Sequence, residues 1–145
     1  MAANTSPIYT NVPKVSWAKV SAADSSTDGT DADVVLVFTA DATDGSYISR
    51  LVFQPRSTSG STTTSAAAGR IYINNGSTVA TGTNNVLFKE ILLPATAVNT
   101  GATAPALGYE VTLNMQLPAS YRVYVGVTAV AANTNWDVCG VGGDY

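Results

Sequence analysis

Histidine is absent from this sequence, cysteine occurs once, and only 12% of the 145 residues are charged. The lack of histidine excludes the Ser-His-Asp triad, the Cys-His dyad and every zinc site that needs imidazole. The single cysteine, Cys139, cannot form an intrachain disulfide, which excludes a disulfide-bridged fold. The charged fraction is well below the ~25% typical of soluble domains, whereas the hydrophobic fraction of 46% is ordinary. Small neutral polar residues take the place of the charges, and they indicate a surface that contacts other proteins.

Basic residues and long apolar runs are also scarce. The net charge is −3 and the pI is near 4.5, so the basic footprint of a nucleic-acid-binding protein is missing. The apolar stretches 34–38 and 123–130 are too short to cross a bilayer. The first residues contain neither the basic region nor the apolar core of a secretory signal. We therefore expect no nucleic-acid partner, no membrane partner and synthesis in a cytoplasm.

Short segments with the pattern of β-strands make up most of the chain. Apolar and polar residues alternate within 109–117 and within 121–130, which indicates strands with one buried and one solvated face. The brief connection at 118–120 predicts that these two strands form an antiparallel hairpin. Six further strands are expected at residues 17–22, 34–39, 47–54, 70–74, 86–93 and 136–141.

Two of these segments support a more detailed prediction. Segment 34–39 is nearly continuous in apolar, β-branched residues, which is typical of a central strand buried on both faces. In segment 47–54, the alternation puts Tyr47 and Leu51 on one face and Ile48 on the other.

About eight strands separated by turn residues predict an all-β fold. The natural closure of eight antiparallel strands is a single antiparallel β-sandwich, of jelly-roll type or of another Greek-key topology. Residues 1–13 are expected to form an extended N-terminal arm, because Pro7 and Pro13 disfavour a central strand, and residues 14–145 the β-sandwich domain. Segments 56–65 and 98–107 consist of small, neutral residues and are expected to be loops.

Oxygen ligands for calcium gather in the stretch from Asp24 to Asp33. Calcium prefers several carboxylate and carbonyl oxygens on a tight loop, and this stretch offers Asp28 and Asp31 as well. It lacks the acid that ends an EF-hand loop, and Asp and Gly also build turns at strand ends. The turn interpretation is favoured, so we expect no cofactor and keep structural calcium at Asp24–Asp33 as the alternative.

Catalytic patterns are weak, and we expect this chain not to be an enzyme. Ser16 and Lys19 match the Ser-x-x-Lys pattern of penicillin-binding enzymes, but that chemistry needs a helix and this segment alternates like a strand. Glu110 falls on the solvated face of its strand. Aromatic residues could instead form a carbohydrate-stacking platform, or serve in the core and in subunit contacts; they are Trp17, Trp136, Tyr9, Tyr47, Tyr72, Tyr109, Tyr121, Tyr124 and Tyr145.

Four segments resemble small virion proteins of tailed bacteriophages. They are the opening Ala-Asn-Thr-Ser-Pro-Ile-Tyr-Thr-Asn-Val-Pro at 3–13, Ile-Tyr-Ile-Asn-Asn-Gly at 71–76, Asn-Asn-Val-Leu-Phe-Lys-Glu-Ile-Leu-Leu-Pro-Ala at 84–95 and Gly-Gly-Asp-Tyr at 142–145. The resemblance spans most of the chain, and its motifs are structural rather than chemical. It implies a capsid decoration (cement) protein that binds the major capsid protein on the outer surface of the head, often as a homotrimer. Synthesis would then take place in the host cytoplasm.

Two other roles fit the same residues. The chain could be another virion structural protein, such as a tail, fibre or baseplate component, or a carbohydrate-binding β-sandwich module. For any virion role we expect the arm to contact neighbouring subunits or the capsid, with Ile8, Tyr9, Val12 and Trp17 as the interaction residues.

Overall fold

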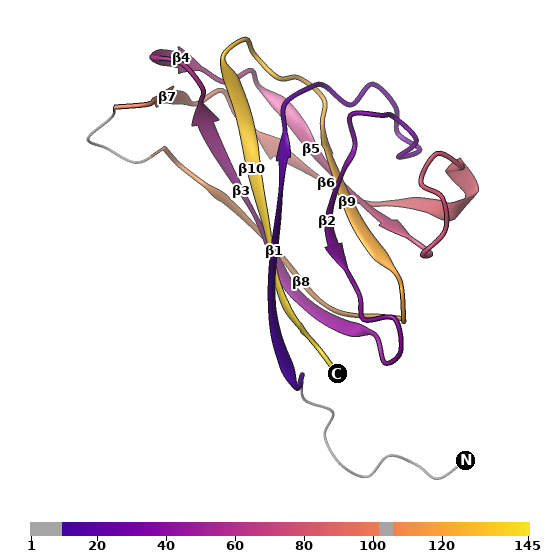
Figure 1. The fold of residues 1–145 in the computed structure, drawn as a ribbon. Helices are drawn as coiled ribbons and strands as arrows, with labels where there is room; N and C mark the ends of the chain where they lie inside the picture. Colours follow the sequence, from indigo (N-terminus) through magenta and orange to yellow (C-terminus); the bar gives the residue numbers. More distant parts are fainter. Residues whose placement is uncertain (1–9, 102–105) are drawn as a thin grey trace, which may run out of the picture.

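The computed structural model describes residues 10–101 and 106–145, which form ten strands and one short 3-10 turn (Figure 1). The predicted all-β class is confirmed. In chain order the elements are β1 (Val12–Val20), β2 (Val35–Thr39), β3 (Ser46–Ser57), β4 (Ser61–Thr63), β5 (Ala67–Asn74), η1 (Gly82–Asn84), β6 (Asn85–Leu93), β7 (Ala97–Asn99), β8 (Tyr109–Leu117), β9 (Arg122–Val127) and β10 (Thr134–Asp144).

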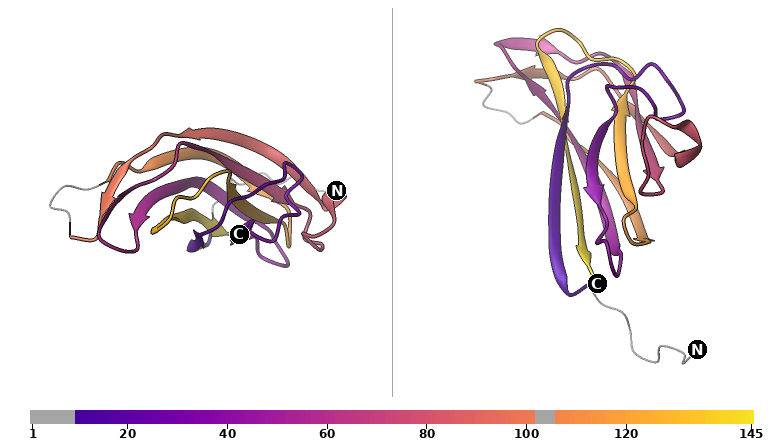
Figure 2. Two further views of the ribbon diagram at one scale, coloured as in Figure 1. Left: turned by 90° about the horizontal axis from the view of Figure 1, so that it is seen from above. Right: turned by 45° about the vertical axis from the view of Figure 1, so that its right-hand side comes forward.

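Three antiparallel sheets contain these strands. The first has the order β1-β10-β3-β8, the second β2-β9-β5-β6, and the third only β4 and β7. β1 and β10 run side by side over their whole length, so the C-terminus lies next to the start of β1 (Figure 2). Among the described residues, no helix has the length and apolar character needed to span a bilayer.

The third sheet corrects the expected strand count of about eight and the expectation of one sandwich. Residues 61–63 pair with residues 97–99, inside two segments that the sequence predicts to be loops. Each strand is three residues long and carries mostly Ser, Thr, Ala and Asn, so it has no apolar alternation to identify it. The pairing is between residues more than thirty positions apart, and only the folded chain brings them together.

The predicted hairpin of 109–117 with 121–130 is wrong. β8 pairs with β3 in the first sheet, whereas β9 pairs with β2 and β5 in the second sheet. The short connection at 118–120 therefore crosses from one sheet to the other. Both strands still direct their apolar faces into the shared core, and this is why alternation alone could not separate a hairpin from a crossover.

β2 lies at the edge of the second sheet, which corrects its prediction as a central strand. Its register shifts between Leu36 and Phe38, and this irregularity buries the consecutive residues Val37 and Phe38 while Leu36 stays 42% exposed. The continuous apolar run thus reflects a bulge at an edge, not burial on both faces.

A second bulge corrects the faces expected in β3. Ile48 and Leu51 are both fully buried, although their spacing would put them on opposite faces of a regular strand. The register shifts between Ile48 and Arg50, opposite Asn114, whose φ of 45° is a left-handed conformation that Asn tolerates. Tyr47 lies on the outer face, where its hydroxyl donates to Asn114 Oδ1 at 2.8 Å.

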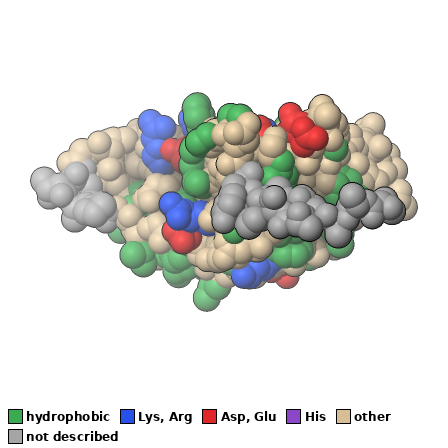
Figure 3. All heavy atoms as spheres, turned by 90° about the horizontal axis from the view of Figure 1, so that it is seen from below, with side chains coloured by type: hydrophobic (Ala, Val, Ile, Leu, Met, Phe, Trp, Pro, Cys, Tyr) green, Lys and Arg blue, Asp and Glu red, His purple; other side chains and the backbone are tan. Residues whose placement is uncertain are grey.

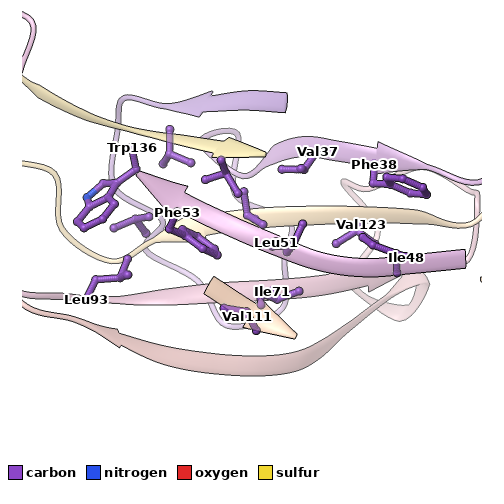
Figure 4. Close-up of a cluster of buried hydrophobic side chains, with 14 of the residues drawn as sticks. Val37, Phe38, Ile48, Leu51, Phe53, Ile71, Leu93, Val111, Val123 and Trp136 are labelled. Atoms are coloured by element: carbon purple, nitrogen blue, oxygen red, sulfur yellow. The ribbon is translucent and has the colours of Figure 1, made fainter. Parts of the chain in front are cut away.

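One continuous core lies between the two larger sheets (Figure 4). Its fully buried side chains come from β3 and β10 on one side and from β5 and β9 on the other. Trp136 is completely buried, with its ring centroid 6.0 Å from that of Tyr109. Each large apolar side chain in this core contributes about 1.5–3 kcal/mol relative to an exposed position.

Candidate functional site

β1 forms an edge of the first sheet and presents large apolar side chains to solvent. Val15 is 58% exposed and Trp17 76% exposed, while Ala18 and Val20 on the alternate positions pack inward. A tryptophan at an open sheet edge leaves a large apolar area in water, which is typical of a contact surface rather than of a free one.

The strand register extends this apolar face across three strands. Trp17 lies opposite Cys139 of β10, and Cys139 lies opposite Val52 of β3. Val15 lies opposite Val141 in the same way. We call these five residues, Val15, Trp17, Val52, Cys139 and Val141, the Trp17 surface.

A shallow groove of about 390 Å³ runs along the Trp17 surface. Trp17, Val52 and Cys139 line it together with Lys19, Gln54, Arg56 and Asp137 at its polar end. An exposed indole beside an apolar groove can receive an aromatic, proline or aliphatic side chain from a partner.

The charges around the groove are paired with one another. Arg56 Nη1 lies 3.7 Å from Asp137 Oδ2, and Arg50 Nε lies 3.5 Å from Glu110 Oε2. Such exposed pairs stabilise the fold by only about 0–1 kcal/mol, but they leave this face close to neutral. At the end of the molecule where β1 begins, charged side chains are likewise scattered among neutral ones (Figure 3).

The start of β1 is fixed to the end of the chain. Asn11 N donates to Asp144 O at 2.7 Å, and Lys14 Nζ lies 3.0 Å from Asp144 Oδ1. Ser46 Oγ donates to the same carboxylate. Lys14 Nζ also lies 5.3 Å from the ring centroid of Phe38, a cation–π contact that links β1 to β2. The chain therefore enters β1 at a defined place and direction.

The expected interaction residues do not share one face. Ile8 and Tyr9 lie outside the described residues. Val12 is 53% exposed and begins β1, but it occupies the alternate position from Trp17, so the two point to opposite faces of the strand. Val15 shares the face of Trp17 instead.

Sequence reasoning missed four members of the Trp17 surface: Val15, Val52, Cys139 and Val141. Alternation shows that a strand has two faces, but not which strands are neighbours or which face another layer covers. The free cysteine is half-buried within this surface.

The acidic loop before β2 uses its carboxylates within the loop itself. Asp28 accepts hydrogen bonds from Ser26 Oγ and from Thr30, and Asp31 accepts from Ser25 N and Asp33 N. The hydrogen bond from the Ser25 side chain, together with the backbone hydrogen bonds, lowers the pKa of Asp31 to about 2. Among the described residues, no group of three or more acidic or cysteine side chains is arranged to hold a metal ion.

A buried cluster holds this loop against the outer face of the second sheet. Asp24 is 1% exposed and accepts a 2.7 Å hydrogen bond from the Tyr72 hydroxyl. Arg70 Nη1 lies 3.5 Å from Asp24 Oδ2 and donates to Ser26 O at 2.8 Å. Gly126 of β9 makes room for the carboxylate, because a Cβ there would come within 2.5 Å of Asp24 Oδ2.

The aromatic residues do not form a stacking platform. Trp136 is fully buried, and Tyr72 and Tyr124 are buried beneath the loop before β2. Trp17 is the large aromatic side chain that the described structure leaves mostly exposed. On the other large sheet, β6 exposes Val86, Phe88 and Leu92.

Comparisons with known proteins give one distant likeness. No family model matches the chain, and no curated protein matches it. Among solved structures, the chain is similar to a chain of the cyanophage Pam1 capsid asymmetric unit, with 16% sequence identity and a TM-score of 0.41. The likeness covers 97% of this chain and 91% of that chain. It is too distant to assign a fold or a function.

Proposed function

We propose that this chain is a bacteriophage capsid decoration protein, which binds the outer surface of the head and stabilises the lattice of the major capsid protein. The observation that carries the proposal is the Trp17 surface, an exposed apolar strip on a sheet edge. Within the head, another protein would cover this surface. The resemblance of the sequence to small virion proteins of tailed bacteriophages supports the same role.

The energetics of a repeated, neutral contact support this proposal. Burying a side chain such as Trp17, which exposes 76% of its surface, removes apolar area at about 25 cal/mol per Å². The paired charges beside it need not lose hydration without gaining a partner, which is the costly step in forming a contact. A modest interface repeated over many copies also gains through avidity. Such a role requires no catalytic group, and we propose none.

We propose that the two larger sheets form a jelly roll. When β4 and β7 are set aside as a small addition, the other eight strands can be counted one to eight along the chain. Their orders then become 1-8-3-6 and 2-7-4-5. Two Greek keys wound together give this interleaving of early and late strands. The single core shared by both sheets supports the same interpretation.

Cosedimentation separates the decoration role from other virion roles. DNA-filled heads and detached tails from the phage that encodes this chain are centrifuged separately with the purified protein. We expect the protein to sediment with heads and not with tails. Sedimentation with tails alone would reject decoration in favour of a tail, fibre or baseplate role.

Carbohydrate binding is the second candidate, because the exposed indole of Trp17 could stack on a sugar ring. A glycan array distinguishes the two. Binding that is lost in Trp17→Ala would favour the carbohydrate module, whereas a blank array would remove it. Trp136→Ala is not informative in this test, because that side chain belongs to the core.

A further inference from the structure

We infer that the groove of the Trp17 surface receives the N-terminal segment, residues 1–9, of a second copy of this chain. The inference rests on the proposal that the Trp17 surface is covered by another protein, and it names that protein. Three observations carry it: the neutrality of the groove, the composition of the segment and the place where the segment joins β1.

The groove favours an uncharged occupant. Arg56 is paired with Asp137 and Arg50 with Glu110, so a charged partner would lose hydration without gaining a free counter-charge from these residues. The apolar part of the groove, around Trp17, Val52 and Cys139, is suited to aliphatic, proline or aromatic side chains.

The N-terminal segment has this composition. Residues 1–11 contain no Asp, Glu, Lys or Arg side chain, and they include Pro7, Ile8 and Tyr9 in succession. Proline and tyrosine stack on an indole ring, and isoleucine fills an aliphatic groove.

The junction with β1 favours a second copy over the same chain. Asn11 is bonded to Asp144 and continues the line of β1, so the chain approaches β1 from beyond the end of the sheet. To cover its own Trp17, the segment would have to reverse at Thr10 and run back along the outer face of β1. Nine extended residues span roughly 30 Å, which is enough to reach a neighbouring domain.

Disulfide trapping in the full-length protein tests this inference. Cys139 is the single cysteine of the chain and lines the groove, so Ile8→Cys adds one potential partner for it. Mild oxidation of purified Ile8→Cys protein should give a covalent dimer on non-reducing gels. Mixing isotopically light and heavy protein, followed by peptide mapping, should show residue 8 linked to Cys139 of the other chain.

Two control variants make the result specific. Ile8→Cys combined with Cys139→Ser should lose the mapped link, and Thr83→Cys, an exposed position beside the other sheet, should not cross-link to Cys139. An intrachain disulfide, no disulfide to Cys139, or equal linkage from Thr83→Cys would overturn the inference. The test contains no heads, so its failure leaves head binding as a separate question. Loss of head binding in Trp17→Ala without trapping would mean that a capsid protein covers the surface instead.

Discussion

The outer faces of the two larger sheets differ in how they are covered. On the second sheet, the loop before β2 covers Tyr72 and Tyr124, and the buried carboxylate of Asp24 holds it there. On the first sheet, Val15 and Trp17 remain open to solvent, and the charges around them pair on the surface. One face is completed by the chain itself, whereas the other provides a contact for a partner. The difference teaches that a polar anchor, not only apolar area, decides which face the chain covers.

Removal of the anchor carboxylate should have the largest effect on stability. Asp24→Ala leaves Arg70 and the Tyr72 hydroxyl without their buried partner, which typically costs about 3–5 kcal/mol. Urea unfolding followed by tryptophan fluorescence measures the loss. The exposed Asp33→Ala is the matched control and should change the free energy of unfolding by no more than about 0.5 kcal/mol. Equal stability of the two variants would show that the loop is not held by this cluster.

Tyr72→Phe should have a smaller effect on the same face. The substitution keeps the buried ring and removes hydrogen bonds to Asp24 Oδ2 and Ser26 O, at a cost of about 1–3 kcal/mol. Tyr47→Phe serves as the control, because its bond to Asn114 is exposed and water can replace it. The comparison of faces fails if Tyr47→Phe is the more destabilised of the two in the same unfolding experiment.

The acid dependence of the loop should give the smallest effect. The folded pKa of Asp31, about 2, lies below its ordinary value of 3.8. The ionised carboxylate therefore adds stability that is fully present above about pH 4 and is lost as the pH falls through 2. Melting temperatures of the wild type and Asp31→Ala should differ at pH 6 and converge toward pH 2. A difference that stays constant over this range would contradict the assignment.

The sequence was sufficient to predict the strands but not their neighbours. Segment 109–117 was predicted with the bounds that the structure gives, because Val111 and Leu117 alternate with solvated residues. The partner of each strand depends on contacts between distant residues, so the hairpin with 121–130 was wrong. Bulges at Leu36 and Ile48 likewise changed which residues face the core, and no local pattern announces them.

The candidate site was predicted in part. Trp17 was expected to be an interaction residue, and the structure places it on an open edge; Val12 has the same strand but the opposite face. Val52 and Cys139 join the site only because β10 separates β1 from β3. That order is a property of the whole sheet, so the residues beside Trp17 could not be read from its own segment.

The central claim is that the Trp17 surface is an assembly surface in the phage head. Its most direct test measures how fully heads that lack this protein are occupied by added Trp17→Ala and Leu92→Ala proteins. The two wild-type side chains are equally exposed, at 76% and 77%, but Leu92 lies on the other sheet. We expect both variants to unfold within about 0.5 kcal/mol of the wild type. Heads should bind Leu92→Ala normally and lose Trp17→Ala, whereas wild-type occupancy by Trp17→Ala would contradict the account.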